Sequence, residues 1–261
     1  MTSDPTTADP LDSSLDEEST LPRMSFLEHL EELRRRILIS VVAVIVAFAV
    51  CWSFAPEIFE WLQAPIKPLL KGETLAYTRL AAPFFLYMKA AFLAGLFLAS
   101  PVILWQLWRF IAPGLYRRER LYAAPFIIFS TLFFVAGGYF GHRVVLPMAA
   151  AFFLELGENF QQVITIDDYF AVASKLILGM GLVFEMPTLI FFLARLGIVT
   201  PKFLLKKFKY AVLIIFIIAA IITPTPDPVT QSALAVPMIL LYLLGVGIAM
   251  LFGKKEVGSR K

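Results

Sequence analysis

Six long apolar segments run through this chain of 261 residues, and they limit its fold more than any other feature. A helix needs roughly 20 residues to cross the hydrocarbon core of a bilayer. Five of the six segments come near or exceed that length, and the short alternating segments of a membrane β-barrel do not occur. We therefore predict an all-α, polytopic membrane protein with six transmembrane helices. The segments cover residues 37–54, 84–108, 121–146, 169–196, 208–222 and 232–252.

The fifth segment, residues 208–222, is the shortest and ends at the proline-rich run 223–228. As a helix it would be about 22 Å long, whereas the hydrocarbon core is about 30 Å thick. Either the membrane is thinner beside this helix, which would suit the docking of a partner, or the helix leans on longer neighbours inside the bundle. The sequence leaves both interpretations open.

The positions of lysine and arginine predict the orientation of the chain. If the N-terminus is cytoplasmic, the inner segments carry 17 of the 23 basic residues. Short cytoplasmic loops of membrane proteins are enriched in lysine and arginine. We therefore predict that both termini are cytoplasmic. The six basic residues on the outer side are Lys67, Lys71, Arg79, Lys89, Arg143 and Lys175.

The composition divides the chain into three regions. Residues 1–22 contain six acidic side chains, no lysine or arginine and no apolar centre, and they are rich in Ser, Thr and Pro. This composition predicts a disordered acidic tail rather than a cleavable signal peptide. Residues 23–253 form the predicted six-helix transmembrane domain, and residues 254–261 form a short basic tail.

The sequence offers little for bond-making chemistry. His29 and His142 do not pair with another histidine or a cysteine at the spacing of a zinc site. Cys51 is the single cysteine, which excludes an intramolecular disulfide and a CxxC motif. Neither a G-x-S-x-G nucleophile turn nor a phosphate-binding glycine loop occurs. We expect a protein that is not an enzyme, uses no cofactor or metal and binds no nucleic acid.

Glycines inside the apolar segments are predicted to serve helix packing, because small residues let transmembrane helices approach closely. Gly137 and Gly141 have the four-residue spacing typical of such contacts. The other glycines in this group are Gly179, Gly181, Gly245 and Gly247.

The segment 25–36 begins with a capping box and continues with apolar side chains at helical spacing, so it predicts a helix that runs directly into the first span. Glu32 lies on the polar face of this helix. Its simplest interpretation is an ion pair with Arg36, four residues further on, beside a similar pair of Glu31 with Arg35.

Glu119 is the single acid in the predicted inner loop 109–120, among several arginines. Such a carboxylate is usually neutralised by its neighbours. Glu119 and Glu32 are nevertheless both predicted at the inner membrane surface, on separate helices, where two carboxylates could hold two guanidinium groups. Arginine donates to a carboxylate through a planar fork that lysine lacks.

Glu185 is predicted to lie inside the fourth span. An ionised carboxylate at that depth is costly, so Glu185 must face protein or water or stay protonated, and a functional role is the default interpretation. Pro187 is expected to bend the helix just after it. Lys89 and Lys175, near the outer ends of spans, are expected to extend outward to the interface.

Two outer stretches are also apolar. Residues 56–70 carry several apolar side chains between charged ones, which suits a helix lying in the membrane interface. Residues 148–154 follow Pro147 and are expected to do the same, so that the two stretches together cap the outer face. At the start of the last span, Asp227, Thr230 and Gln231 form a small polar cluster beside the fifth segment.

In combination, five motifs resemble TatC, the multi-span receptor subunit of the twin-arginine protein translocase. The resemblance extends from Phe26 to about Phe252, and the motifs follow one another in the order typical of that family on six spans of the predicted orientation. The motifs are residues 26–34, 100–116, 119–120, 184–187 and 223–228.

The resemblance implies a concave bundle whose last two helices are short. It also implies a core receptor that binds twin-arginine signal peptides of folded precursor proteins at the cytoplasmic face. Such a receptor recruits single-span TatA- and TatB-like subunits, associates with itself, and resides among the lipids of the bacterial cytoplasmic (inner) membrane.

The same resemblance suggests roles for single residues. Glu32 and Glu119 match the acids that contact the paired arginines of the signal peptide. Arg34, Phe110 and Arg120 match neighbours of these acids on the inner face.

Further matches lie elsewhere in the chain. Pro65 matches a proline tied to the function of the first outer loop. Glu185 matches an acid within the concave membrane face. Asp227 and Gln231 match positions at which the fifth and sixth helices are thought to meet the single-span subunits.

A proton-coupled secondary transporter that uses Glu185 is the main alternative. Such a protein would be expected to contain inverted repeats and paired broken helices around a midplane site. The sequence contains no internal repeat, and Glu185 is its single intramembrane acid. An intramembrane enzyme is a third possibility, against which the missing nucleophile–base pair argues.

Overall fold

The computed structural model describes residues 26–70, 72, 74–111, 123–223 and 227–252. Within these ranges the chain is helical apart from its turns and loops, and a single backbone bridge joins Ala76 to Thr165. Five helices are long and apolar enough to cross a membrane, and a sixth apolar helix is shorter. The predicted all-α membrane architecture is therefore confirmed.

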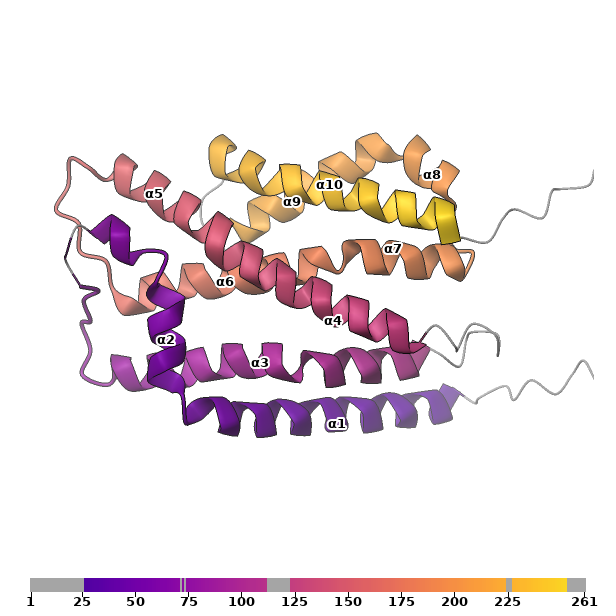
Figure 1. Ribbon diagram of the computed structural model, residues 1–261, viewed down its shortest axis with the longest axis horizontal. Helices are drawn as coiled ribbons and strands as arrows, with labels where there is room; N and C mark the ends of the chain where they lie inside the picture. Colours follow the sequence, from indigo (N-terminus) through magenta and orange to yellow (C-terminus); the bar gives the residue numbers. More distant parts are fainter. Residues whose placement is uncertain (1–25, 71, 73, 112–122, 224–226, 253–261) are drawn as a thin grey trace, which may run out of the picture.

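Six crossings run roughly along the long axis of the molecule (Figure 1). The third and fourth crossings are each made of consecutive helices. The crossings are α1 (Phe26–Trp52), α3 (Ala82–Ile111), α4 (Ala123–Phe140) with the π-helical turn η4 (Gly141–Val145) and α5 (Leu146–Leu156), α6 (Ile166–Phe184) with α7 (Met186–Arg195), α9 (Phe208–Ile222) and α10 (Pro228–Phe252).

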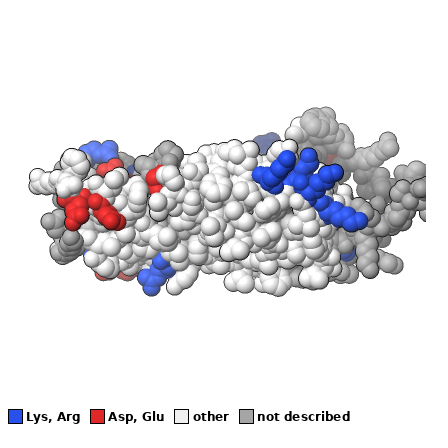
Figure 2. Space-filling model, turned by 90° about the horizontal axis from the view of Figure 1, so that it is seen from above, with Lys and Arg blue, Asp and Glu red and all other residues white. Residues whose placement is uncertain are grey.

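The described chain begins and ends at the same end of this bundle, on the right of Figure 1, as an even number of crossings requires. Figure 2 shows the largest group of lysine and arginine atoms toward that end of the visible face, and aspartate and glutamate, with fewer basic atoms, toward the opposite end. This is the distribution that the positive-inside rule associates with a cytoplasmic end. The cytoplasmic location of both termini remains a prediction, and the tails 1–22 and 254–261 lie outside the described residues.

The fifth crossing, α9, has the predicted bounds and 15 residues. The sixth, α10, has 25 residues, so the expectation that the last two helices are short is right for the fifth and wrong for the sixth. The extra length lies at the start of α10. There, Pro228 occupies a first-turn position that tolerates proline, and Asp227 Oδ1 accepts a hydrogen bond from the backbone N–H of Thr230 at 2.7 Å. The helix thus begins four residues before the predicted apolar segment.

α1 is a single helix of 27 residues, in which the amphipathic segment runs directly into the first span as predicted. The prediction for residues 148–154 is wrong. Residues 148–154 belong to α5, which continues the third crossing instead of forming a separate interface helix. Proline ends a helix through the clash and the lost hydrogen bond that it causes in a helix interior. The π-helical turn η4 lies just before Pro147 and places that proline in the first turn of α5.

The end of the bundle opposite the two ends of the described chain is covered by α2 (Ala55–Gln63) and the 3₁₀ turn η1 (Lys67–Leu70), which correspond to the predicted stretch 56–70 (Figure 1). α2 lies across the direction of the long helices (Figure 1). At the basic end, the short helix α8 (Pro201–Lys206) connects α7 to α9.

Side chains from the third and fourth crossings cap the C-terminus of α2. His142 Nε2 lies 3.1 Å from the carbonyl oxygen of Trp61 and 3.3 Å from that of Leu62, and the imidazole stacks on the Trp61 ring. Tyr169 Oη donates to the same Leu62 carbonyl oxygen at 2.6 Å. The last carbonyl groups of a helix lack partners within it, so these contacts fasten α2 to the bundle.

Most of the intramembrane glycines lie at helix contacts, as predicted. A methyl group at Gly137 would overlap the carbonyl oxygen of Met180 on α6, and one at Gly141 would lie 2.8 Å from the carbonyl oxygen of Leu176. α4 and α6 therefore pack backbone to backbone. Gly247 is the exception, because a methyl group there would meet nothing within 4 Å, so helix packing does not explain it.

The two lysines that were expected to extend outward, Lys89 and Lys175, make different contacts. Lys89 Nζ lies 3.3 Å from Asp167, which also pairs with Arg79 at 2.8 Å, so Lys89 joins an ion pair near the start of α6. Lys175 Nζ donates to the carbonyl oxygen of Thr223 at 3.5 Å. This contact connects α6 to the end of the short helix α9.

Candidate functional site

Glu32 lies near the start of α1, at the basic end of the bundle. Arg36, one turn further along, donates to Glu32 Oε1 through Nη2 and, at 3.1 Å, through Nε. The side chains are mostly buried, with exposed fractions of 17% for Glu32 and 16% for Arg36. The predicted pairing of Glu32 with Arg36 is therefore confirmed, in an environment drier than that of an ordinary surface ion pair.

The second carboxylate oxygen of Glu32 differs from the first. Oε2 is buried and accepts no hydrogen bond from the described part of the chain. A carboxylate offers about four acceptor sites on its two oxygens. A buried acceptor left unpaired costs about 1–3 kcal/mol, and more when it is charged. Glu32 thus has one oxygen that accepts two hydrogen bonds and one buried oxygen that accepts none from the described residues.

Gln106 connects this ion pair to α3. Its Oε1 accepts a hydrogen bond from Arg36 Nη1 at 3.2 Å, and its side chain is buried. One helical turn further along α3, the ring of Phe110 stacks on His29 with 4.4 Å between ring centroids. A polar bridge and an aromatic stack therefore hold α1 and α3 together at the basic end.

The other residues predicted for this face are placed differently. Phe110 lies against α1 through His29, one turn before Glu32. Arg34 is exposed and, two residues from Glu32, lies on a different face of α1. Glu119 and Arg120 lie outside the described residues, so their roles remain predictions.

Glu185 lies at a break in the fourth crossing. α6 ends at Phe184 and α7 begins at Met186, which agrees with the bend expected from Pro187. Ser130 Oγ on α4 donates to Glu185 Oε2 at 2.5 Å. The intramembrane acid therefore bonds to protein within the bundle, one of the environments predicted for it.

Asp227 and Gln231 both take part in contacts around the start of α10. Asp227 caps the helix, as described above, and its backbone carbonyl accepts from Gln231 N–H at 3.1 Å. The Gln231 side-chain amide donates to the carbonyl oxygen of Phe216 on α9 at 2.8 Å. These two residues are thus brought together and join the short fifth helix to the sixth, whereas their predicted contact with partner subunits is not tested.

Pro65 lies in the turn between α2 and η1, directly after the helix end that His142 and Tyr169 cap. Its neighbours Leu62 and Ile66 are buried. The loop around Pro65 is therefore anchored on both sides, at the end of the bundle opposite Glu32 (Figure 1).

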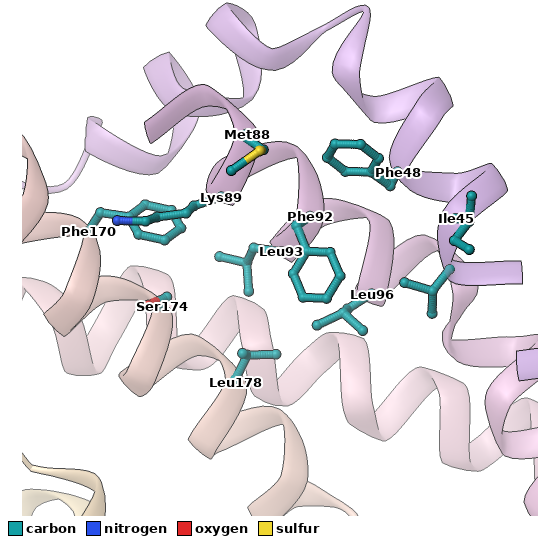
Figure 3. A pocket seen from close by; sticks show the side chains of 11 residues that line it. Ile45, Phe48, Met88, Lys89, Phe92, Leu93, Leu96, Phe170, Ser174 and Leu178 are labelled. Carbon is teal, nitrogen blue, oxygen red and sulfur yellow. The ribbon is translucent and has the colours of Figure 1, made fainter. Parts of the chain in front are cut away.

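An apolar groove of about 530 Å³ opens beside α1, α3 and α6 (Figure 3). In that view Lys89 and Phe170 lie toward one end of it and Ile45 and Leu96 toward the other. Glu185 does not line the groove. Its lining residues are Val44, Ile45, Phe48, Met88, Lys89, Phe92, Leu93, Leu96, Phe170, Ser174 and Leu178.

From the sequence alone, Arg36 is only an i,i+4 partner of Glu32, and nothing assigns a role to Gln106. One signal could have drawn attention to Gln106, because it lies four residues before Phe110 in an apolar helix and hence on the same face. Its partner Arg36 is 70 residues away in the chain, which the sequence alone does not reveal.

Comparison with known proteins assigns the family. The family model for the Sec-independent protein translocase protein (TatC) matches residues 28–237. The TatC of Koribacter versatilis is 45% identical over 259 residues, covering 98% of this chain and 96% of the relative. The TatC of Desulforapulum autotrophicum is 42% identical over 233 residues, covering 88% of this chain and 86% of the relative.

A solved structure agrees with this assignment. The crystal structure of a twin-arginine translocase receptor, TatC, superposes with a TM-score of 0.75 at 36% sequence identity. The match covers 86% of this chain and 99% of the crystallised chain. By sequence and by fold, this chain belongs to the TatC family of Sec-independent protein translocase proteins.

Proposed function

We propose that this protein is the core receptor of a twin-arginine translocation system. It binds twin-arginine signal peptides of folded precursor proteins at its basic, cytoplasmic end and recruits single-span TatA- and TatB-like subunits. The proposed location is the bacterial cytoplasmic membrane, with both termini in the cytoplasm. The observation that carries the proposal is the buried oxygen of Glu32 at that end of the bundle, which has no hydrogen-bond partner among the described residues.

Glu32 suits an arginine of the signal peptide for a geometric reason. Arg36 already donates two N–H groups to Oε1. Oε2 accepts none from the described residues, and it can accept two. An incoming guanidinium can donate the two N–H groups of one of its edges to Oε2, much as Arg36 donates two N–H groups to Oε1. In this proposal the Glu119 carboxylate contributes the site for the second arginine.

Long-range charge does not account for recognition of a cationic peptide, because the end of the bundle around Glu32 is rich in arginine and lysine. Specificity must come from short hydrogen bonds in a partly dry site, where electrostatic interactions are stronger than in water. A lysine ammonium lacks the planar fork of arginine. Replacing Arg-Arg by Lys-Lys is therefore expected to weaken binding although the peptide charge is unchanged.

The apolar groove offers a place for the apolar part of the signal peptide. Secretory signal peptides carry an apolar segment of about 7–15 residues after their basic start. Val44, at the groove, follows Glu32 by 12 residues on α1, which is about 18 Å along the helix. A helical apolar segment of about 12 or more residues that starts beside Glu32 is long enough to reach the groove.

The proposed role requires no bond chemistry. The family to which the chain belongs is a protein translocase family. Among the described residues no group of three or more metal-binding side chains occurs. In this proposal the binding of peptides and subunits provides the whole activity.

The transporter alternative is less well supported. It would require Glu185 to face a path for substrate or protons near the middle of the membrane. Glu185 instead bonds to Ser130, and the groove beside α1, α3 and α6 is lined by other residues, almost all of them apolar.

Photo-crosslinking tests the proposed function. A twin-arginine signal peptide with a photoreactive residue beside its arginines is bound to native membranes that contain the wild-type protein, Glu32→Ala or Glu119→Ala. The proposal predicts a crosslink to the wild type and its loss in either variant at equal protein abundance. A peptide that never crosslinks, or that crosslinks equally to all three proteins, would contradict it.

A further inference from the structure

Three side chains at the basic end form a chain of hydrogen bonds across two helices. Gln106 on α3 accepts from Arg36 Nη1, and Arg36 donates to Glu32 Oε1 through its other two nitrogens. Each guanidinium nitrogen thus has a partner. Glu32 and Arg36 are mostly buried, and Gln106 is buried.

This arrangement fixes the orientation of the Glu32 carboxylate. An i,i+4 pair alone leaves both long side chains free to change rotamer, and such pairs contribute little at a surface. Here Gln106, on a separate helix, fixes the plane of the Arg36 guanidinium. That guanidinium fixes Oε1, and Oε2 is thereby held in one buried position without a partner among the described residues.

We propose that Gln106 and Arg36 are positioning residues that set the preference of Glu32 for arginine over lysine. The proposal rests on the proposed function, because it concerns the same peptide-binding carboxylate. It adds that the preference for arginine depends on how rigidly the Glu32 carboxylate is oriented, and not only on its negative charge.

The physical reason lies in the difference between the two cations. A guanidinium donates through a rigid planar fork, so its binding depends on where the acceptor oxygen points. An ammonium is a compact charge with three rotatable donors and adapts to many acceptor positions. Loosening Glu32 should therefore weaken arginine binding strongly and lysine binding little.

Two variants loosen Glu32 without removing it. Gln106→Met keeps the side-chain length and removes the acceptor for Arg36, and Arg36→Lys keeps the charge and removes the fork. Arg35→Lys is the matched control, because the neighbouring Arg35 is exposed. Gln106→Glu is the conservative variant, because its carboxylate still accepts from Arg36.

The full-length variants are placed in lipid nanodiscs, and their affinities for two synthetic signal peptides, identical except for Arg-Arg or Lys-Lys, are measured by fluorescence anisotropy. In Gln106→Met and Arg36→Lys, the affinity for the Arg-Arg peptide should fall about tenfold, equivalent to one charged hydrogen bond of about 1.4 kcal/mol. The affinity for the Lys-Lys peptide should change by less than about twofold. Arg35→Lys and Gln106→Glu should keep the wild-type ratio of the two affinities.

The ratio of the Arg-Arg affinity to the Lys-Lys affinity distinguishes a positioning role from a general loss of structure. An unfolded fraction of the protein lowers the apparent affinities for both peptides alike. A wild-type ratio in both Gln106→Met and Arg36→Lys would overturn the inference while leaving the proposed function intact. If the Gln106→Met variant does not accumulate in the membrane, the affinity ratio measured for Arg36→Lys alone tests the inference. A wild-type protein that binds the two peptides equally would instead overturn the proposed function, and this inference with it.

Discussion

The side-chain amide of Gln231, at the start of α10, donates a hydrogen bond of 2.8 Å to the backbone carbonyl of Phe216 in the middle of α9. α9 has only 15 residues, and Lys175 on α6 donates a further hydrogen bond to the carbonyl oxygen of Thr223 at its end. The short fifth helix is therefore held to its neighbours by polar contacts as well as apolar packing. This supports the interpretation in which it leans on longer helices.

Gln231→Leu should lower the stability of the protein. The variant loses one hydrogen bond within the membrane, which is worth about 1 kcal/mol, so the apparent melting temperature in detergent should fall. Ser232→Ala, at the exposed adjacent position, is the control and should melt as the wild type does. An unchanged melting temperature together with lost binding of single-span subunits would instead assign Gln231 to partner contact alone.

Gly137→Ala should destabilise the protein, because its methyl group overlaps the Met180 carbonyl oxygen and forces α4 away from α6. Such overpacking typically costs about 1–3 kcal/mol. Gly247→Ala is the matched control: it meets open space, and alanine favours a helix interior over glycine by about 1 kcal/mol. Thermal unfolding of both variants should therefore shift in opposite directions, and equal shifts would show that the α4–α6 contact is looser than described.

Tyr169→Phe should loosen the outer cap. The variant removes the hydroxyl group that donates to Leu62 at the end of α2, at a cost of about 0.5–1.5 kcal/mol. Limited proteolysis should cut the outer loop near Pro65 faster than in the wild type. Tyr77→Phe, at an exposed position, should leave the cleavage rate unchanged. Equal cleavage of wild type and Tyr169→Phe would mean that His142 and the apolar contacts suffice to hold α2.

Glu185→Gln should preserve binding of a twin-arginine peptide. Its amide oxygen still accepts from Ser130, so the contact between α4 and the α6–α7 junction remains. Glu185→Leu removes that acceptor and leaves the buried Ser130 hydroxyl group without it, at a cost of about 1–3 kcal/mol. Peptide affinity and melting temperature of the two variants test this, and a Glu185→Gln variant that folds but no longer binds peptide would reopen the proton-coupled alternative.

Much of the fold could be predicted because hydrophobicity and proline act locally. The short fifth helix followed from an apolar run that ends at prolines, and the break at Glu185 followed from Pro187. The start of α10 was misplaced because its cap depends on the side chain of Asp227, outside the apolar run.

The site could be predicted only in part. Glu32 and its partner Arg36 lie one helical turn apart, so their pairing is visible in the sequence. Gln106 and the contact of His142 with Trp61 were missed because each joins residues at least 70 positions apart. Such contacts depend on which helices pack together, and the pattern of residues in a single sequence does not reveal helix packing.

The most direct test of the account compares the affinities of matched Arg-Arg and Lys-Lys signal peptides for the wild-type protein and for Glu32→Gln. The wild type should bind the Arg-Arg peptide at least about tenfold more tightly, equivalent to about 1.4 kcal/mol. Glu32→Gln removes the charge that strengthens these hydrogen bonds and should lose most of that preference. Equal affinities of the wild type for the two peptides, or an unchanged preference in Glu32→Gln, would contradict Glu32 as the residue that recognises arginine.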